Sequence, residues 1–81
     1  MIKMDKTVKI GMVNSPNYNG IRYQVFLDEV SGIVWIESEI GMNQVGENVD
    51  VNSPTKAEYA LRVAFEFLKK HEDVFKFKRY F

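Results

Sequence analysis

The chain has no cysteine and a single histidine among its 81 residues. The absence of cysteine excludes a disulfide framework, a thiolate metal site and a cysteine nucleophile. His71 has no second ligand at a spacing typical of zinc sites, and we interpret it as a residue that interacts with the end of a helix. We therefore expect neither a metal nor a cofactor.

The chain also lacks long apolar runs and an excess of charge of either sign. Its longest apolar run, Ile33–Ile36, is too short for a signal peptide or a membrane span. Lys and Arg together number 11, Asp and Glu together number 11, and the net charge is zero. Because 46% of the residues are hydrophobic, the chain has enough apolar surface to form a core. We expect one globular domain over residues 1–81, cytoplasmic and without membrane contact.

Motifs that carry catalysis are missing as well. The glycines form neither a dinucleotide-binding GxGxxG nor a phosphate-binding loop, and no Gly-x-Ser-x-Gly is present. Glu37 and Glu39 fall on one face of an expected strand, but no nucleophile or orienting base accompanies them. We interpret them as solvated sheet residues and do not expect an enzyme.

The first half of the chain alternates apolar and polar residues, a pattern typical of half-buried β-strands. In the first expected strand this alternation places Val8, Ile10 and Met12 on one face. A four-residue loop, Glu29–Gly32, joins the second strand to the third in a hairpin. The three expected strands cover residues 7–13, 21–28 and 33–40.

The loop length predicts the register of this hairpin, because it sets Asp28 opposite Ile33. One face then pairs Leu27 with Val34, Val25 with Ile36, Tyr23 with Ser38, and Ile21 with Ile40. The other face pairs Phe26 with Trp35, Gln24 with Glu37, and Arg22 with Glu39. An aromatic pair, a polar pair and an ion pair on one face support this register.

A helix is expected in the second half of the chain. Residues 41–53 form a polar connection, in which residues 48–52 are a candidate short strand. Ser53 and Pro54 are typical of a helix N-cap and first helical position, and the helix is expected to end near His71. The predicted fold is α+β: a three- or four-stranded antiparallel sheet with one long C-terminal helix packed on one face.

The apolar residues of this helix form two stripes at 100° per residue. The first stripe is expected to pack on the sheet and contains Ala57, Leu61, Ala64, Phe65 and Leu68. The second stripe lies roughly opposite and contains Tyr59, Val63 and Phe67. A loop or the N-terminal arm would cover the second stripe in one interpretation, and a helix–helix contact across a two-fold axis would cover it in the other.

The functional hypothesis is non-catalytic binding to a protein, either as a homodimer or as a small inhibitor or adaptor. Its anchors are an aromatic pair on the sheet face that the helix leaves open, together with the second helix stripe. The candidate partner-binding residues are Arg22, Phe26, Trp35, Tyr59, Val63 and Phe67. In the competing interpretation, the C-terminal tail folds back over the aromatic pair.

The alternative hypothesis is a single-strand nucleic-acid binder that stacks bases on the same aromatic residues. Residues 74–81 alternate aromatic and basic side chains and are expected to form an edge strand or an arm, unless they are disordered. The candidate phosphate-binding residues are Lys9, Lys76, Lys78 and Arg79. Glu37 and Glu39 on the aromatic face would repel phosphate, which favours a protein partner. A small-ligand site between sheet and loop is a third, weaker hypothesis.

Overall fold

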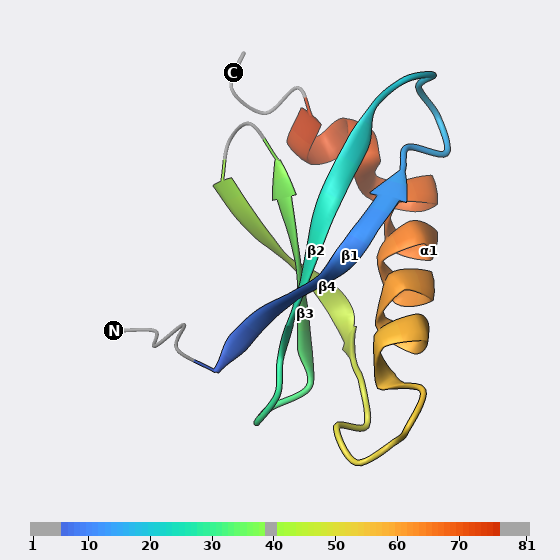
Figure 1. Ribbon diagram of the computed structural model, residues 1–81. Helices are drawn as coiled ribbons and strands as arrows, with labels where there is room; N and C mark the ends of the chain where they lie inside the picture. The colour runs from blue at the N-terminus through green and yellow to red at the C-terminus, as the bar shows by residue number, and fades with distance from the viewer. Residues whose placement is uncertain (1–5, 39–40, 77–81) are drawn as a thin grey trace.

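The computed structural model describes residues 6–38 and 41–76, without the side chains of residues 46, 47 and 74–76. Within these residues the chain forms a four-stranded antiparallel sheet in the order β1-β2-β3-β4, followed by one helix (Figure 1). The elements are β1 (Thr7–Asn14), β2 (Arg22–Asp28), β3 (Ile33–Ser38), β4 (Gly41–Asn48) and α1 (Lys56–Lys76). The predicted α+β class is confirmed, and the sheet has four strands.

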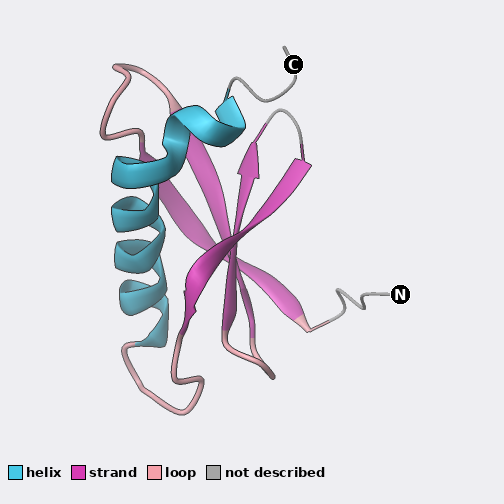
Figure 2. Ribbon diagram, turned by 180° about the vertical axis from the view of Figure 1, so that it is seen from behind, coloured by secondary structure: helices cyan, strands magenta, loops and turns pink. Residues whose placement is uncertain are grey.

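The fold has two layers, with α1 packed across one face of the sheet (Figures 1 and 2). The core lies between them because alternate side chains of the two central strands point toward the helix. On the sheet side the core contains Tyr23, Val25, Leu27, Val34, Ile36, Val45 and Val49. On the helix side it contains Ala60, Val63, Ala64 and Leu68.

The register of the β2–β3 hairpin is as predicted over the residues paired in the structure. Gln24 lies opposite Glu37, Val25 opposite Ile36, Phe26 opposite Trp35, and Leu27 opposite Val34. The expected partners Glu39 and Ile40 lie outside the described residues. The hairpin therefore separates an apolar face, which forms the core, from a face centred on two aromatic residues.

Asp28 closes the hairpin loop through its side chain and its backbone. Its carboxylate accepts hydrogen bonds from the backbone N–H groups of Val30 (2.8 Å) and Ser31 (3.2 Å). Its carbonyl accepts one from Gly32 N–H (2.8 Å). The two bonds to the carboxylate, that of Val30 first, lower the pKa of Asp28 below its ordinary value of 3.8.

The lowered pKa predicts how Asp28→Asn changes the acid dependence of stability. An ionised Asp28 stabilises the fold above its unfolded pKa, and this contribution is lost as the pH falls through the folded pKa. Urea unfolding should therefore show a more stable wild type than Asp28→Asn at neutral pH. The difference should shrink as the pH falls through the folded pKa of Asp28, because the protonated side chain is neutral, as asparagine is. A difference that stays the same at acidic and neutral pH would contradict this assignment.

The loop is also packed tightly against the residue that follows β4. Val49 N–H donates a hydrogen bond to the Gly32 carbonyl (2.7 Å). Gly32 has a positive φ of 81°, and a Cβ atom at this position would lie 2.1 Å from the Val49 carbonyl oxygen. The close approach of these two backbone segments therefore requires glycine.

The prediction that Val8, Ile10 and Met12 share one face of β1 is wrong. A β-bulge separates Lys9, which lies opposite Phe26, from Gly11, which lies opposite Val25. The extra residue reverses the alternation, so Met12 lies opposite Gln24, on the side of the sheet away from the helix. A glycine within a strand pattern often marks such a bulge, and Gly11 was the available signal.

The fourth strand lies before the segment in which a strand was predicted. Residues 41–48 form β4, whereas residues 49–52 are not part of a strand, and Asn52 N–H donates to the Asp50 carboxylate (3.0 Å). Val45 is a buried residue of β4, and the strand otherwise contains glycine, asparagine and glutamine among its residues. Its pairing with β3 stabilises it through backbone hydrogen bonds rather than through an apolar pattern.

The helix begins two residues after Pro54 and extends five residues beyond the predicted end. The predicted cap is present in part, because Thr55 N–H donates to the Ser53 hydroxyl oxygen (3.2 Å). Residues 74–76 continue α1, so the tail does not begin as an edge strand at Val74. The last turns of α1 bend across the end of the sheet that carries the β1–β2 loop (Figures 1 and 2).

Candidate functional site

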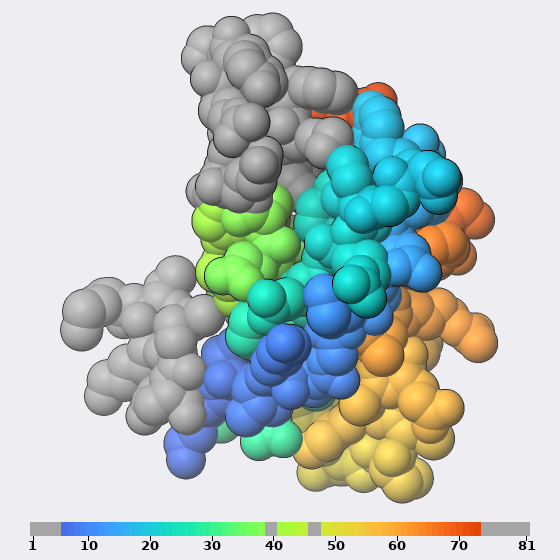
Figure 3. Space-filling view, turned by 45° about the horizontal axis from the view of Figure 1, so that its top comes forward, coloured from blue at the N-terminus to red at the C-terminus, as the bar shows by residue number. Residues whose placement is uncertain are grey.

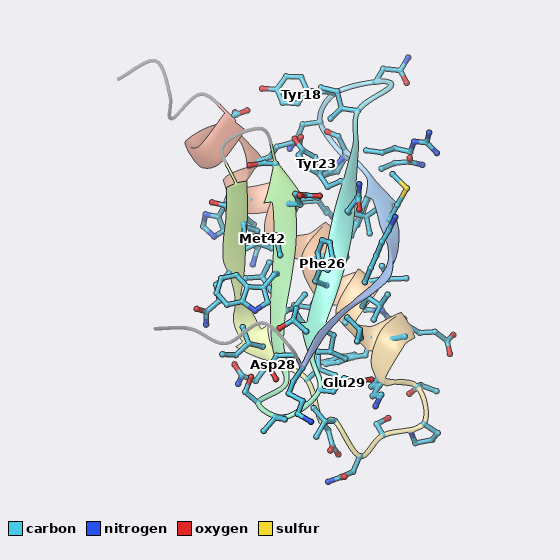
Figure 4. The ribbon with its side chains drawn as sticks, turned by 60° about the vertical axis from the view of Figure 1, so that its left-hand side comes forward. Tyr18, Tyr23, Phe26, Asp28, Glu29 and Met42 are labelled. Atoms are coloured by element: carbon cyan, nitrogen blue, oxygen red, sulfur yellow. The ribbon has the colours of Figure 1, made fainter. Side chains whose placement is uncertain are left out.

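The side of the sheet turned away from α1, which we call the far face, contains two rows of side chains that cross all four strands. The first row is Met12, Gln24, Glu37 and Met42, and the second is Lys9, Phe26, Trp35 and Gln44. Figure 4 shows Phe26 and Met42 on this face, with α1 behind the sheet. Within the described part of the chain, no helix crosses the far face (Figures 1 and 2).

The centre of the far face is the pair Phe26 and Trp35, which lie directly opposite one another on β2 and β3. Both side chains are half-buried. The indole N–H of Trp35 is buried, and no described residue accepts a hydrogen bond from it. An unpaired buried donor costs about 1–3 kcal/mol, so the position of Trp35 is not explained by a hydrogen bond within the described residues.

Two methionines flank this aromatic pair at the outer strands. Met12 on β1 and Met42 on β4 are both exposed. The bulge in β1 brings Met12 to this face, and β4 was not predicted where it lies, so the sequence analysis assigned neither methionine to the site. Methionine adapts its shape readily and is common at binding surfaces, so both residues extend the apolar area around the aromatic pair.

The charges of the far face are divided between its two halves. Lys9 and Arg22 are exposed on β1 and β2, and Glu37 is exposed on β3. Neither of the salt bridges found among the described residues, Lys56–Glu29 and Lys69–Glu66, involves this face. The β1 and β2 surfaces lie side by side in Figure 3, with α1 at the edge of the view.

Tyr59, Val63 and Phe67 do not form the predicted second stripe opposite the helix face that packs on the sheet. Val63 is 7% exposed and belongs to the core, and Phe67 packs partly against it. Tyr59 is 44% exposed, and Phe65, which was expected to face the sheet, is exposed as well. The face of α1 that contacts the sheet includes Val63, unlike the predicted face. The small side chains of Ala60 and Ala64 allow the helix to approach the sheet closely on this side.

The basic residues proposed for nucleic-acid binding are not brought together in the described structure. Lys9 lies on the far face beside Phe26. Lys76 is the last residue of α1, and its side chain is not described. Lys78 and Arg79 lie outside the described residues.

A second cluster, which the sequence analysis missed, lies where the β1–β2 loop meets α1. Glu72 is 1% exposed, although it was interpreted as a residue beyond the helix. Its carboxylate accepts hydrogen bonds from the Ser15 hydroxyl (2.7 Å), the Asn17 amide (3.0 Å) and the Tyr23 hydroxyl. Three donors and no cation surround this carboxylate among the described residues.

This Glu72 cluster fixes the loop to the helix. The Asn17 amide also donates to the Leu68 carbonyl oxygen (3.1 Å), and the Ser15 hydroxyl accepts from Tyr18 N–H (2.9 Å). The Tyr18 hydroxyl donates a hydrogen bond to the Asp73 carboxylate, and this hydrogen bond raises the pKa of the Tyr18 phenol above its ordinary value. The hydrogen bonds described for this cluster join its residues to one another and to Leu68 and Asp73 of α1, and we interpret the cluster as structural.

The described residues contain no group of three or more side chains suited to holding a metal ion. Their helix, α1, is not apolar enough over a sufficient length to cross a bilayer. A comparison with protein families, curated proteins and solved structures gave no match. The far face and the Glu72 cluster are therefore interpreted from their own geometry.

Proposed function

We propose that the protein is a non-catalytic, cytoplasmic protein-binding module whose docking surface is the far face of the sheet. Phe26 and Trp35 are the central anchors, Met12 and Met42 are adaptable contacts around them, and the exposed Arg22 and Glu37 belong to the polar rim. Such an arrangement matches the usual anatomy of protein interfaces, in which an aromatic centre is surrounded by polar residues.

The observation that supports this proposal best is the state of Trp35. Its ring stands beside Phe26 on a face that no described helix crosses, and no described residue accepts a hydrogen bond from its buried N–H. A tryptophan at the centre of an interface contributes both apolar contact and one directed hydrogen bond. A protein partner that packs against the half-buried ring of Trp35 gains this apolar contact.

The charge on the far face favours a protein over a nucleic acid. Glu37 lies in the row next to Trp35, where its negative charge would meet the phosphates of a strand stacked on the aromatic pair. Affinity for nucleic acid comes mainly from neutralising phosphates with basic residues. On the far face only two described basic residues, Lys9 and Arg22, are available for this.

Replacing Trp35 with alanine is expected to weaken partner binding by about 2 kcal/mol or more, roughly thirtyfold in Kd. The matched control is Tyr59→Ala, which removes an exposed aromatic ring from the helix side. Both variants and the wild type would be immobilised, exposed to lysate of the source cells, and the retained proteins identified and titrated. A partner retained by wild type and Tyr59→Ala but lost from Trp35→Ala supports the proposal.

Two results would overturn it. Equal retention of every partner by Trp35→Ala and wild type, with the circular dichroism of the variant unchanged, would exclude the far face as the docking surface. Quenching of Trp35 emission by a mixed single-stranded oligonucleotide, with affinity that falls steeply with salt, would establish nucleic-acid binding instead. Trp35 is the only tryptophan, so its emission reports on this face alone.

A further inference from the structure

We infer that the partner on the far face is a second copy of this chain, packed sheet against sheet. The two-fold axis lies in the interface, runs parallel to the strands, and passes between β2 and β3. This inference rests on the proposed function and names the partner of the same surface. The inference is based on the two rows of far-face side chains, which meet compatible side chains when the second copy is placed by this rotation.

Rotation about this axis places β1 over β4 of the second copy and β2 over its β3. Phe26 then lies over the partner's Trp35, and Met12 over the partner's Met42. In the polar positions, Gln24 lies over the partner's Glu37, and Lys9 over the partner's Gln44. Each aromatic, apolar or hydrogen-bonding side chain thus meets one of compatible chemistry.

The charges select this axis over the perpendicular one. Rotation parallel to the strands sets the half with Lys9 and Arg22 against the half with Glu37. A two-fold axis perpendicular to the strands would place each strand over the same strand of the second copy. Depending on where this axis crosses the strands, Lys9 faces Lys9 of the second copy, or Glu37 faces an aromatic ring. Like charges placed opposite one another disfavour association, so only the first arrangement is self-complementary.

Asp28 carries a negative charge on β2, but it is the last residue of that strand, and its carboxylate is held by Val30 and Ser31 of the loop. Under the same rotation the half-buried rings of Phe26 and Trp35 pack against their counterparts in the second copy. The dimer therefore accounts for an aromatic pair on a face that no described helix crosses.

Thiol cross-linking tests the arrangement directly, because the chain has no cysteine of its own. Met12→Cys and Met42→Cys would be prepared separately and treated with a short bis-maleimide, alone and as an equimolar mixture. The mixture should form a cross-linked dimer, since β1 of one copy covers β4 of the other. Each variant alone should not, because its two thiols lie about three strand spacings, roughly 14 Å, apart along the sheet.

Tyr59→Cys mixed with Met42→Cys is the control, because Tyr59 lies on the helix side and should give no dimer product. Sedimentation equilibrium of the wild type should show a monomer–dimer equilibrium that Glu37→Lys shifts toward monomer, because the reversed charge then faces the basic half of the partner. Glu37 is exposed, so this variant should keep its fold.

A cross-linked dimer formed by Met12→Cys alone would contradict the proposed position of the two-fold axis. If the protein is a monomer at all concentrations and the mixture gives no cross-linked dimer, the partner is not a second copy of this chain. In that case the retention assay with Trp35→Ala tests the proposed function separately. If the wild type retains a different protein and Trp35→Ala does not, the far face is still a docking surface. Blue-shifted Trp35 emission in such a monomer would indicate cover by the chain's own tail, against both proposals.

Discussion

Replacing Gly32 with alanine is expected to destabilise the protein by about 4 kcal/mol or more, enough to unfold much of it. Two effects add at this position. A left-handed backbone costs a non-glycine residue about 1–2 kcal/mol, and Gly32 has a φ of 81°. In addition, the new Cβ would stand 2.1 Å from the Val49 carbonyl oxygen, which is a backbone atom and cannot turn away.

The second effect extends beyond the loop because the same two residues are hydrogen-bonded. Moving Val49 away breaks the bond from its N–H to the Gly32 carbonyl and shifts a buried core residue. A protein of this size has a free energy of unfolding of about 4–12 kcal/mol. The substitution therefore removes a large part of the total stability.

Gly20→Ala is the matched control, because Gly20 has a nearly identical φ of 84° but no atom within 4 Å of the added Cβ. It should lose only the backbone contribution, about 1–2 kcal/mol. Urea unfolding followed by circular dichroism would measure both variants. Equal midpoints for Gly20→Ala and Gly32→Ala would show that the contact with Val49 is not a constraint.

Replacing Glu72 with leucine is expected to cost about 3–5 kcal/mol of folding free energy. The substitution leaves the hydroxyls of Ser15 and Tyr23 and the amide of Asn17 without their common acceptor. A buried donor that loses its acceptor costs about 1–3 kcal/mol, and the cost is smaller for the half-buried Ser15 and the exposed Asn17, which can turn to water. Asn17 retains one such acceptor, the Leu68 carbonyl.

Glu72→Gln should lose much less, about 1 kcal/mol, because its amide oxygen still accepts from Ser15 and Asn17 and its amide group can donate to the Tyr23 oxygen. Asp73→Leu is the positional control, since Asp73 is exposed and contacts the exposed Tyr18 hydroxyl. Urea unfolding of the three variants checks the order. A loss in Asp73→Leu as large as that in Glu72→Leu would contradict a specific role for the buried carboxylate.

The β2–β3 hairpin could be predicted residue by residue because two local signals agreed. The loop length set the pairing, and the pairing then placed Phe26 beside Trp35 and Val25 beside Ile36. No comparable agreement was available for β4. Its glycine and asparagine residues are typical of turns, and it becomes a strand because β3 presents an edge with unpaired backbone groups.

The far face was therefore predicted at its centre and missed at its borders. Met12 reaches this face only through the bulge after Lys9, and a single added residue reverses every side chain that follows it. The helix faces were misassigned for a related reason, since a broad apolar arc does not indicate which of its residues meet the sheet. Val63 became core and Phe65 became exposed.

The Glu72 cluster could not be predicted because its members lie 49 to 57 residues apart in the chain. Nothing in the spacing of Ser15, Asn17 and Tyr23 indicates a common acceptor. A glutamate near the end of a helix rich in charged residues is usually exposed to water. Only the bend of α1 over the end of the sheet brings it into contact with the loop.

The strand order β1-β2-β3-β4 has a consequence for how the protein forms during synthesis. Every strand pairs with the one next to it in the chain, so the sheet can assemble from its central hairpin outward through short-range contacts, which favours fast folding. The helix, however, leaves the ribosome after all four strands. Until Leu68 and Glu72 have emerged, the sheet has no cover on its apolar side, and the nascent chain exposes both faces to other proteins in the cell.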